Sequence, residues 1–419
     1  MTKKARTILF AVLLVLFLLF APALIFYSQG YRIDFQPPEG RIKITQTGGI
    51  FLKVVPKQVQ IYLDGKLKKK TDFFFGSALI ENLLPKKYKI EVRKEGYFTW
   101  QKNLEVKEKE VAEAKNIVLF PENANFTILA KGVENFWLSP NKKEMVVKEP
   151  GWSLKLYDLE TNIKSHLVDE TDFFLTEASL LSLEFSKDNP KEISLEIGAR
   201  EQLKYFTLTI DKIPPVLNEA TPPASSSEDF GISQSFGGEN YFLDNFGNLF
   251  KGEEKLTDKP FPIKTETDYS LDIFPNFIFL KENQDLYRFN PESKSFEHFF
   301  EGIKNLKTSP DQRKLAYSSD HEIWVLFLQE KTDPPQKKAG DKILIARLSK
   351  GINDYFWLNS DYLILNSGEL IKIAEIDERD QINIIDFASF KNPEIFWNDL
   401  NKKLYILSNG NIYTSESLF

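Results

Sequence analysis

The chain has 419 residues, of which 42% are hydrophobic and 27% charged, and its formal net charge is -6. This length exceeds one ordinary hydrophobic core, so we expect two or three domains, and the composition excludes a chain that is disordered throughout. The absence of cysteine excludes disulfides, thiolate metal sites and cysteine nucleophiles. It fits a reducing compartment and an extracytoplasmic bacterial protein equally well.

An uncharged segment follows the basic residues Lys3, Lys4 and Arg6 in a short stub, residues 1–7. As a helix, the segment would rise about 28 Å, close to the thickness of a bilayer's hydrocarbon core. We predict a transmembrane helix or signal anchor over residues 8–27 and a juxtamembrane linker over residues 28–47. The basic stub places the N-terminus in the cytoplasm and the bulk of the chain outside, as a single-pass cell-membrane protein.

Two alternatives to an uncleaved anchor stay open, a cleaved signal peptide and a buried helix of a soluble protein. Ala21-Pro22-Ala23 resembles a small-residue cleavage site. The apolar residues continue beyond it through Leu24 to Tyr27, however, which favours the anchor.

The charge is unevenly divided along the chain. Residues 38–121 contain 17 Lys+Arg and 10 Asp+Glu, a net of +7, whereas residues 122–419 contain 33 and 49, a net of -16. Nucleic-acid-binding domains usually present a basic face. Because the larger part is acidic, we predict no nucleic-acid partner.

Short alternating segments and turn residues predict a small β-sandwich over residues 48–121. Asp64-Gly65 is typical of a type I′ hairpin turn. This region resembles the PEGA domain family, and the resemblance rests on Pro56, Val59, Ile61-Tyr62-Leu63-Asp64-Gly65-Lys66, Thr71, Leu84-Pro85 and Lys94-Glu95-Gly96-Tyr97. It departs from the family where the namesake Pro-Glu-Gly-Ala reads Pro56-Lys57-Gln58-Val59 and where Lys86 follows Pro85. The resemblance implies an extracytoplasmic β-domain of cell-envelope proteins and no particular chemistry.

Clustered lysines in this region suggest two interpretations. They discourage strand-to-strand aggregation at a solvated edge, or they bind an anionic polymer or lipid headgroups together with exposed aromatics. The candidate polymer-binding residues are Lys66, Lys68, Lys69, Lys70, Lys86, Lys87, Tyr97 and Trp100.

A phrase of alternating apolar and polar residues recurs after Pro121, with copies beginning at Asn135, Leu183, Asn240, Asn276, Ser309, Tyr355 and Ile395. Such repeats predict a β-propeller over residues 122–419 with about seven blades, six or eight staying open, because a single blade cannot bury both of its faces. We expect residues 124–131 to form the outer strand of the last blade and close the ring. The proline-rich stretches near residues 213–230 and 331–341 are expected to be exposed loops.

The copy at Ser309 resembles the TolB-like and WD40-like propeller repeats. Ser309-Pro310-Asp311, Lys314-Leu315-Ala316-Tyr317 and Glu322-Ile323-Trp324-Val325 match the family pattern, and Ser139-Pro140-Asn141 matches it in part. We expect structural roles, including large rings wedged between blades, for Ser139, Pro140, Ser309, Pro310, Asp311, Trp137, Trp324, Trp357 and Trp397.

The sequence contains no recognisable catalytic motif. His166, His298 and His321 lie at no metal-ligand spacing, and His321-Glu322 does not continue as H-E-x-x-H. The stretch Gly231-Ile-Ser233-Gln-Ser235 lacks the second glycine of a nucleophile elbow. We therefore predict no enzyme, no catalytic or metal-binding residue and no cofactor; a degenerate enzyme of the propeller type stays a third interpretation.

Together these features predict a mainly β, membrane-anchored extracytoplasmic binding or scaffold protein. In the first hypothesis, the propeller is a platform for another envelope protein or a peptide. In the alternative, the basic small domain binds cell-wall polysaccharide or another anionic polymer. The sequence specifies neither the ligand nor the oligomeric state.

Overall fold

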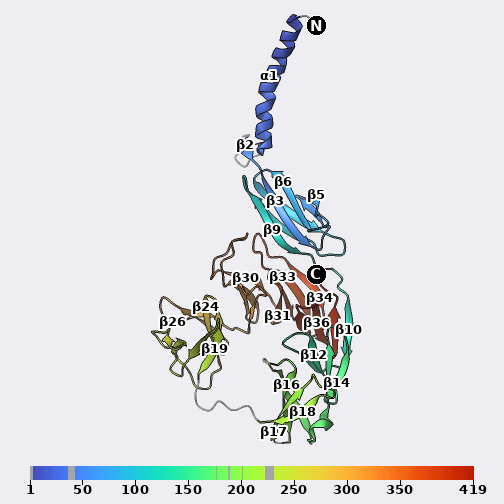
Figure 1. Cartoon of the computed structure of the whole chain (residues 1–419), viewed down its shortest axis with the longest axis vertical. Coiled ribbons are helices and arrows are strands. Elements are labelled where there is room, and N and C mark those ends of the chain that lie inside the picture. Colours follow the sequence, from blue (N-terminus) through green and yellow to red (C-terminus); the bar gives the residue numbers. More distant parts are fainter. Residues whose placement is uncertain (1–2, 36–42, 176, 187–188, 201, 222–230) are drawn as a thin grey trace.

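The computed structural model describes residues 3–35, 43–175, 177–186, 189–200, 202–221 and 231–419. Helix α1 (Lys3–Ser28) contains the apolar segment predicted over residues 8–27 and is long and apolar enough to cross a membrane. No residue of α1 is buried against the rest of the described chain. Signal sequences share these properties. Figure 1 shows α1 projecting from one end of the molecule.

A two-stranded hairpin connects α1 to the small domain, where the sequence had predicted only a linker. It pairs β1 (Tyr31–Asp34) with β2 (Lys43–Gln46). The guanidinium group of Arg32 donates hydrogen bonds to the carbonyl of Tyr27 at the end of α1 and to the side chain of Asn82 in the small domain. This arginine therefore ties the helix to the domain that follows it.

The small domain is a sandwich of two sheets around one apolar core. Its strands are β3 (Gly48–Val55), β4 (Gln60–Leu63), β5 (Lys66–Lys70), β6 (Ser77–Leu83), β7 (Lys86–Arg93), β8 (Trp100–Val106) and β9 (Val111–Val118). One sheet has the order β6-β3-β9, with β3 and β9 parallel, and the other has the order β5-β4-β7-β8. Asp64 and Gly65 both have positive φ, as the predicted type I′ turn requires.

The rest of the chain forms a propeller-like series of four-stranded antiparallel sheets, which we call blades. In the described residues there are seven, numbered here in chain order. Blade 1 contains β11 (Asn135–Leu138), β12 (Glu144–Glu149), β13 (Ser153–Asp158) and β14 (Lys164–Val168). Blade 2 contains β15 (Ala178–Phe185), β16 (Glu192–Ala199), β17 (Gln202–Thr209) and β18 (Val216–Ala220). Blade 3 contains β19 (Ile232–Phe236), β20 (Glu239–Leu243), β21 (Leu249–Lys251) and β22 (Glu254–Lys255).

Blades 4 to 7 complete the arc seen in Figure 1. Blade 4 contains β23 (Tyr269–Phe274), β24 (Phe277–Glu282), β25 (Asp285–Asn290) and β26 (Ser295–Phe300), and blade 5 contains β27 (Asn305–Thr308), β28 (Lys314–Ser318), β29 (Glu322–Phe327) and β30 (Lys342–Arg347). Blade 6 contains β31 (Ile352–Asn359), β32 (Tyr362–Ser367), β33 (Leu370–Glu375) and β34 (Ile384–Ser389). Blade 7 contains β35 (Glu394–Asn398), β36 (Lys403–Ser408), β37 (Asn411–Ser415) and β10 (Phe126–Lys131). A short 3-10 helix, Glu170–Phe173, lies between blades 1 and 2.

The predicted closing strand is confirmed. β10 pairs antiparallel with β37 and becomes the outer strand of blade 7. Two segments from opposite ends of the propeller therefore share one sheet.

Apolar clusters fill six of the seven junctions between consecutive blades. No cluster of described residues joins blades 2 and 3. On the face of blade 2 turned away from blade 1, Leu181 and Leu203 stay about half exposed, at 58% and 46%. The predicted exposed loop at residues 213–230 also differs, because β18 occupies part of it; residues 222–230 lie outside the described residues.

The repeat residues occupy turns and cores, as their residue types suggest. Ser139 and Ser309 are each 2% exposed, and each hydroxyl accepts a hydrogen bond from a backbone N–H five residues later. Trp357 and Trp397 are buried, whereas Trp137 and Trp324 are half-buried. Buried serines thus close the first turn of blades 1 and 5.

Candidate functional site

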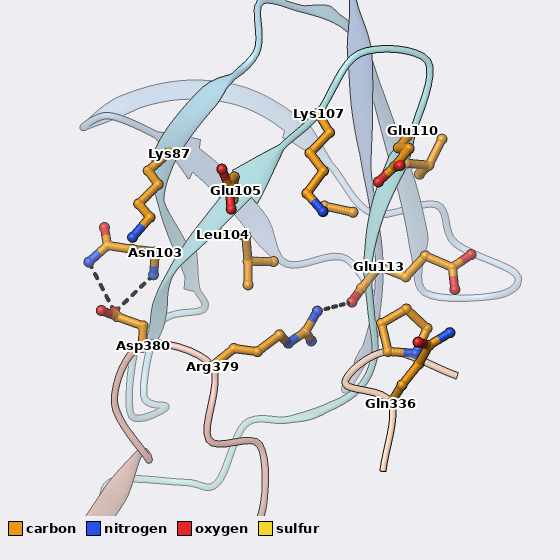
Figure 2. Close-up of a pocket in the computed structure, with 13 residues that line it drawn as sticks. Lys87, Asn103, Leu104, Glu105, Lys107, Glu110, Glu113, Gln336, Arg379 and Asp380 are labelled. Carbon is orange, nitrogen blue, oxygen red and sulfur yellow. Dashed lines mark hydrogen bonds between the residues drawn. The ribbon is translucent and has the colours of Figure 1, made fainter. Parts of the chain in front are cut away.

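The small domain is fixed to the propeller by a loop of blade 6 that covers an open edge of the sandwich. β8 and β9 are edge strands of the two sheets. The loop between β33 and β34 lies across both: Asp380 accepts hydrogen bonds from the backbone and side chain of Asn103 in β8, and Arg379 donates to the carbonyl of Glu113 in β9 (Figure 2). The junction thus satisfies backbone groups of edge strands that would otherwise meet water.

A buried ion pair forms the centre of this junction. The side chains of Lys102 and Glu375 are 0% and 4% exposed, and the Nζ–Oε1 distance is 2.5 Å. Lys102 also donates to the carbonyls of Asp377 and Gln381, and Trp100 donates its indole N–H to Glu375 at 2.8 Å. Every proton of the lysine ammonium therefore has an acceptor.

The electrostatics of the junction reflect competition between burial and partners. Burial raises the pKa of Glu375, with Lys102 and Trp100 acting in the opposite direction. Burial also opposes ionisation of Asp377, but hydrogen bonds from Arg379 and the charge of Lys102 hold the pKa of Asp377 below its usual value. Both groups are placed to hold two folded units together.

A polar groove of about 850 Å³ lies beside the junction (Figure 2). Its lining residues come from β7, β8, β9, the turn between β8 and β9, and two propeller loops: Lys87, Asn103, Leu104, Glu105, Lys107, Glu110, Val111, Ala112, Glu113, Pro334, Gln336, Arg379 and Asp380. These thirteen described residues include amides and charges of both signs but no histidine, serine, threonine or tyrosine. The groove suits a polar ligand and offers no nucleophile paired with a base.

A second depression, of about 670 Å³, which we call the central depression, lies where the inner strands of blades 1, 6 and 7 converge. Phe136, Phe356 and Phe396 line it, and each directly precedes the tryptophan of its repeat. The rings of Phe356 and Phe396 meet edge to face, with centroids 5.5 Å apart. The repeats thus place a phenylalanine from each of three blades at one site.

A lysine of β27, the first strand of blade 5, lies against one of these rings. The Nζ atom of Lys307 lies 3.6 Å from the centroid of the Phe356 ring and 2.7 Å from Oδ1 of Asp354. Burial lowers the pKa of Lys307, and Asp354 opposes that shift. The site therefore already holds one cation against an aromatic face.

The small domain leaves the central depression uncovered. It contacts blade 6 through Tyr362 and the 377–381 loop, at the ends where β32 begins and β33 stops. The depression is lined by Asp354 and Glu394, near the opposite ends of the blades where β31 and β35 begin.

The predicted polymer-binding residues do not form one site. Lys66, Lys68, Lys69 and Lys70 are exposed on β5, an edge strand, while Lys86 is paired with Asp64. Lys87 lines the polar groove instead, and Tyr97 packs against the small-domain core. The expectation of an exposed Trp100 is wrong: its side chain is 4% exposed because blade 6 covers it.

Two groups of carboxylates were considered as cation sites. The structure brings ligand atoms of His166, Asp169 and Asp172 within 4.8 Å of one another, which their sequence spacing had not suggested. Both carboxylates already accept hydrogen bonds from backbone N–H groups at the start of the 3-10 helix. Asp244 accepts hydrogen bonds from two backbone N–H groups of the turn joining β20 and β21, so its carboxylate stabilises a hairpin.

Sequence reasoning missed the phenylalanines of the central depression and the buried pair Lys102–Glu375. The first had a signal, because a phenylalanine precedes the tryptophan in three repeats. The second had none, since a lysine on an alternating strand gives no indication of a distant carboxylate.

No family model matches the chain, and no curated protein matches it. Among solved structures, it is similar to the WD40 repeats of RRP9 (10% identity, TM-score 0.41), covering 70% of this chain and 99% of that one. It is also similar to YCF48 from Cyanidioschyzon merolae (8% identity, TM-score 0.41, 70% and 99%). A third is virginiamycin B lyase from Staphylococcus aureus (14% identity, TM-score 0.40, 71% and 99%).

Proposed function

We propose that this protein is a membrane-anchored, extracytoplasmic scaffold whose propeller binds another envelope protein or a peptide. In this proposal α1 spans a cell membrane, the PEGA-like domain is a rigid spacer, and a seven-bladed propeller presents the binding surface. The protein performs no catalysis.

The central depression carries the proposal. Partly exposed aromatic rings are favoured anchors in protein interfaces because they bury a large area at a small entropic cost. Phe136, Phe356 and Phe396 supply such rings, while Asp354 and Glu394 supply carboxylates beside them. The buried junction supports the same reading, since it keeps the propeller in a fixed orientation on the anchored domain.

A site-specific cross-linking experiment in intact cells tests the proposal. A photoreactive residue replaces Asn353, which lines the depression, in the full anchored chain. We expect one reproducible protein or peptide adduct, lost in the Phe356→Ala/Phe396→Ala variant and retained in Phe174→Ala, which alters a 95% exposed ring elsewhere on the propeller. Adducts that persist in the double variant would reject the depression as the binding site.

The exposed lysines of β5 support a second candidate function, binding of an anionic cell-wall polymer. Four of them follow one edge strand within five residues. A pull-down of purified wall polysaccharide with the full chain tests this function. Binding that survives Phe356→Ala/Phe396→Ala and disappears when the four lysines become glutamate would favour the polymer over the protein partner.

A further inference from the structure

Three consecutive phenylalanines are exposed in the turn between β5 and β6. Phe73, Phe74 and Phe75 are 64%, 74% and 74% exposed. Large apolar side chains grouped on a surface usually mark an interaction site. We call residues 72–76 the phenylalanine loop; it is separate from the groove and from the central depression.

Hydrogen bonds hold this loop in one conformation. The carboxylate of Asp72 accepts hydrogen bonds from the backbone N–H groups of Phe74, Phe75 and Ser77 and from the hydroxyl of Ser77. The ammonium group of Lys57 donates a hydrogen bond to the backbone carbonyl of Phe74. Since the loop is ordered before binding, presenting its rings to a partner costs little conformational entropy.

The surroundings of the loop are basic. Lys66, Lys68, Lys69 and Lys70 are exposed on β5, directly before the loop. The region containing the loop, residues 38–121, has 17 basic and 10 acidic residues, a net of +7. The matching surface should therefore be apolar and acidic.

The loop lies at the end of the small domain away from α1. The loop precedes Ser77 at one end of β6, while Asn82 near the other end is bound to Arg32, which also contacts the last turns of α1. A strand of this length separates the two by roughly 20 Å. Gly76 packs against the carbonyl of Val54, at the end of the small domain where Leu119 leads into the propeller.

We propose that the phenylalanine loop docks on the acidic propeller of a second copy of this chain. Residues 122–419 contain 33 basic and 49 acidic residues, a net of -16, so the chain itself supplies the complementary charge. Copies anchored in one membrane stand in the same orientation, and the loop lies at the end of the small domain that leads into the propeller, so it is at the level where it can reach the propeller of a neighbouring copy. The proposal rests on the anchoring that we proposed for α1.

Energy transfer between labelled copies in lipid vesicles tests this inference. Because the chain has no cysteine, Ser417→Cys provides a single exposed attachment point for donor or acceptor dyes. For the full chain in vesicles we expect transfer above the level of randomly distributed anchors, decreasing as salt rises. Replacing Phe73, Phe74 and Phe75 by serine should reduce it to the random level, and Lys68→Glu/Lys69→Glu should reduce it strongly.

Phe174→Ser is the matched control, since it removes an exposed phenylalanine outside the loop and should leave the transfer unchanged. Equal thermal transitions of all variants exclude unfolding as the cause. Transfer that is random in the wild-type chain, or unchanged in the triple variant, would overturn the proposal. If a dye attached at Phe74→Cys were quenched by quenchers carried on the lipids, the loop would contact lipid, which would also overturn the proposal. A wild-type chain that does not remain bound to the vesicles would reject the membrane anchor, and this result is seen separately from the energy transfer.

Discussion

The ammonium group of Lys102 lies 2.5 Å from Oε1 of Glu375, although one residue belongs to the small domain and the other to blade 6. Neither group reaches water, and each has further hydrogen-bond partners. A buried ion pair gains little over apolar packing but makes the loss of either partner costly. The pair therefore specifies one relative orientation of the two units.

Replacing Lys102 by methionine should destabilise the junction by about 3–5 kcal/mol, because the carboxylate of Glu375 is left buried without a counter-charge. The double variant Lys102→Met/Glu375→Gln should recover most of this loss. Urea unfolding followed by tryptophan fluorescence measures both effects. As a control, Lys304→Met removes a partly exposed partner of Asp320 and should cost no more than about 1 kcal/mol. A double variant as unstable as the single one would contradict the coupling.

Removing residues 409–419 should unfold the propeller. This deletion eliminates β37, so β10 loses its only sheet neighbour among the described strands and β36 becomes an edge. Removing Phe419 alone leaves Asn411–Ser415 paired and should cost much less. Limited proteolysis distinguishes the two results, with rapid digestion of residues 122–408 expected only for the longer deletion.

Tryptophans of different blades should differ in their contribution to stability according to their burial. Trp397 is 2% exposed, so Trp397→Ala should cost about 3–5 kcal/mol. Its indole N–H has no hydrogen-bond partner in the described structure, and Trp397→Phe should therefore be much milder. Trp324 is half-buried and stacks on Tyr317, so Trp324→Ala should cost about 2 kcal/mol. Equal losses for both alanine variants would show that burial does not set the order.

The elements with a local pattern were predictable from the sequence. Alternation and spacing predicted the repeated four-stranded sheets, and the early strand at residues 124–131 indicated that β10 would pair with β37 in the last blade. The parallel pairing of β3 with β9 was not predictable from alternation along each strand. The burial of Trp100 was not predictable either, because alternation shows whether a side chain faces inward or outward but not which other part of the chain covers the outer face. The phenylalanine loop was visible as three adjacent aromatic residues, but only the hydrogen bonds of Asp72 show that it is held open to solvent.

The order of the phenylalanine loop should depend on pH. Hydrogen bonds from Ser77, Phe75 and Phe74 hold the pKa of Asp72 far below its ordinary value of 3.8. A carboxyl group with a lowered pKa in the folded state stabilises that state fully above its ordinary value, and the contribution is lost as the pH falls towards the folded value. Amide exchange at Phe74, Phe75 and Ser77 should therefore stay protected, relative to unfolded reference rates, down to about pH 4 and lose protection below it. In Asp72→Asn the side-chain nitrogen cannot accept from Ser77, so protection at Ser77 should be low at every pH and independent of it. Unchanged protection in that variant would show that the carboxylate does not order the loop.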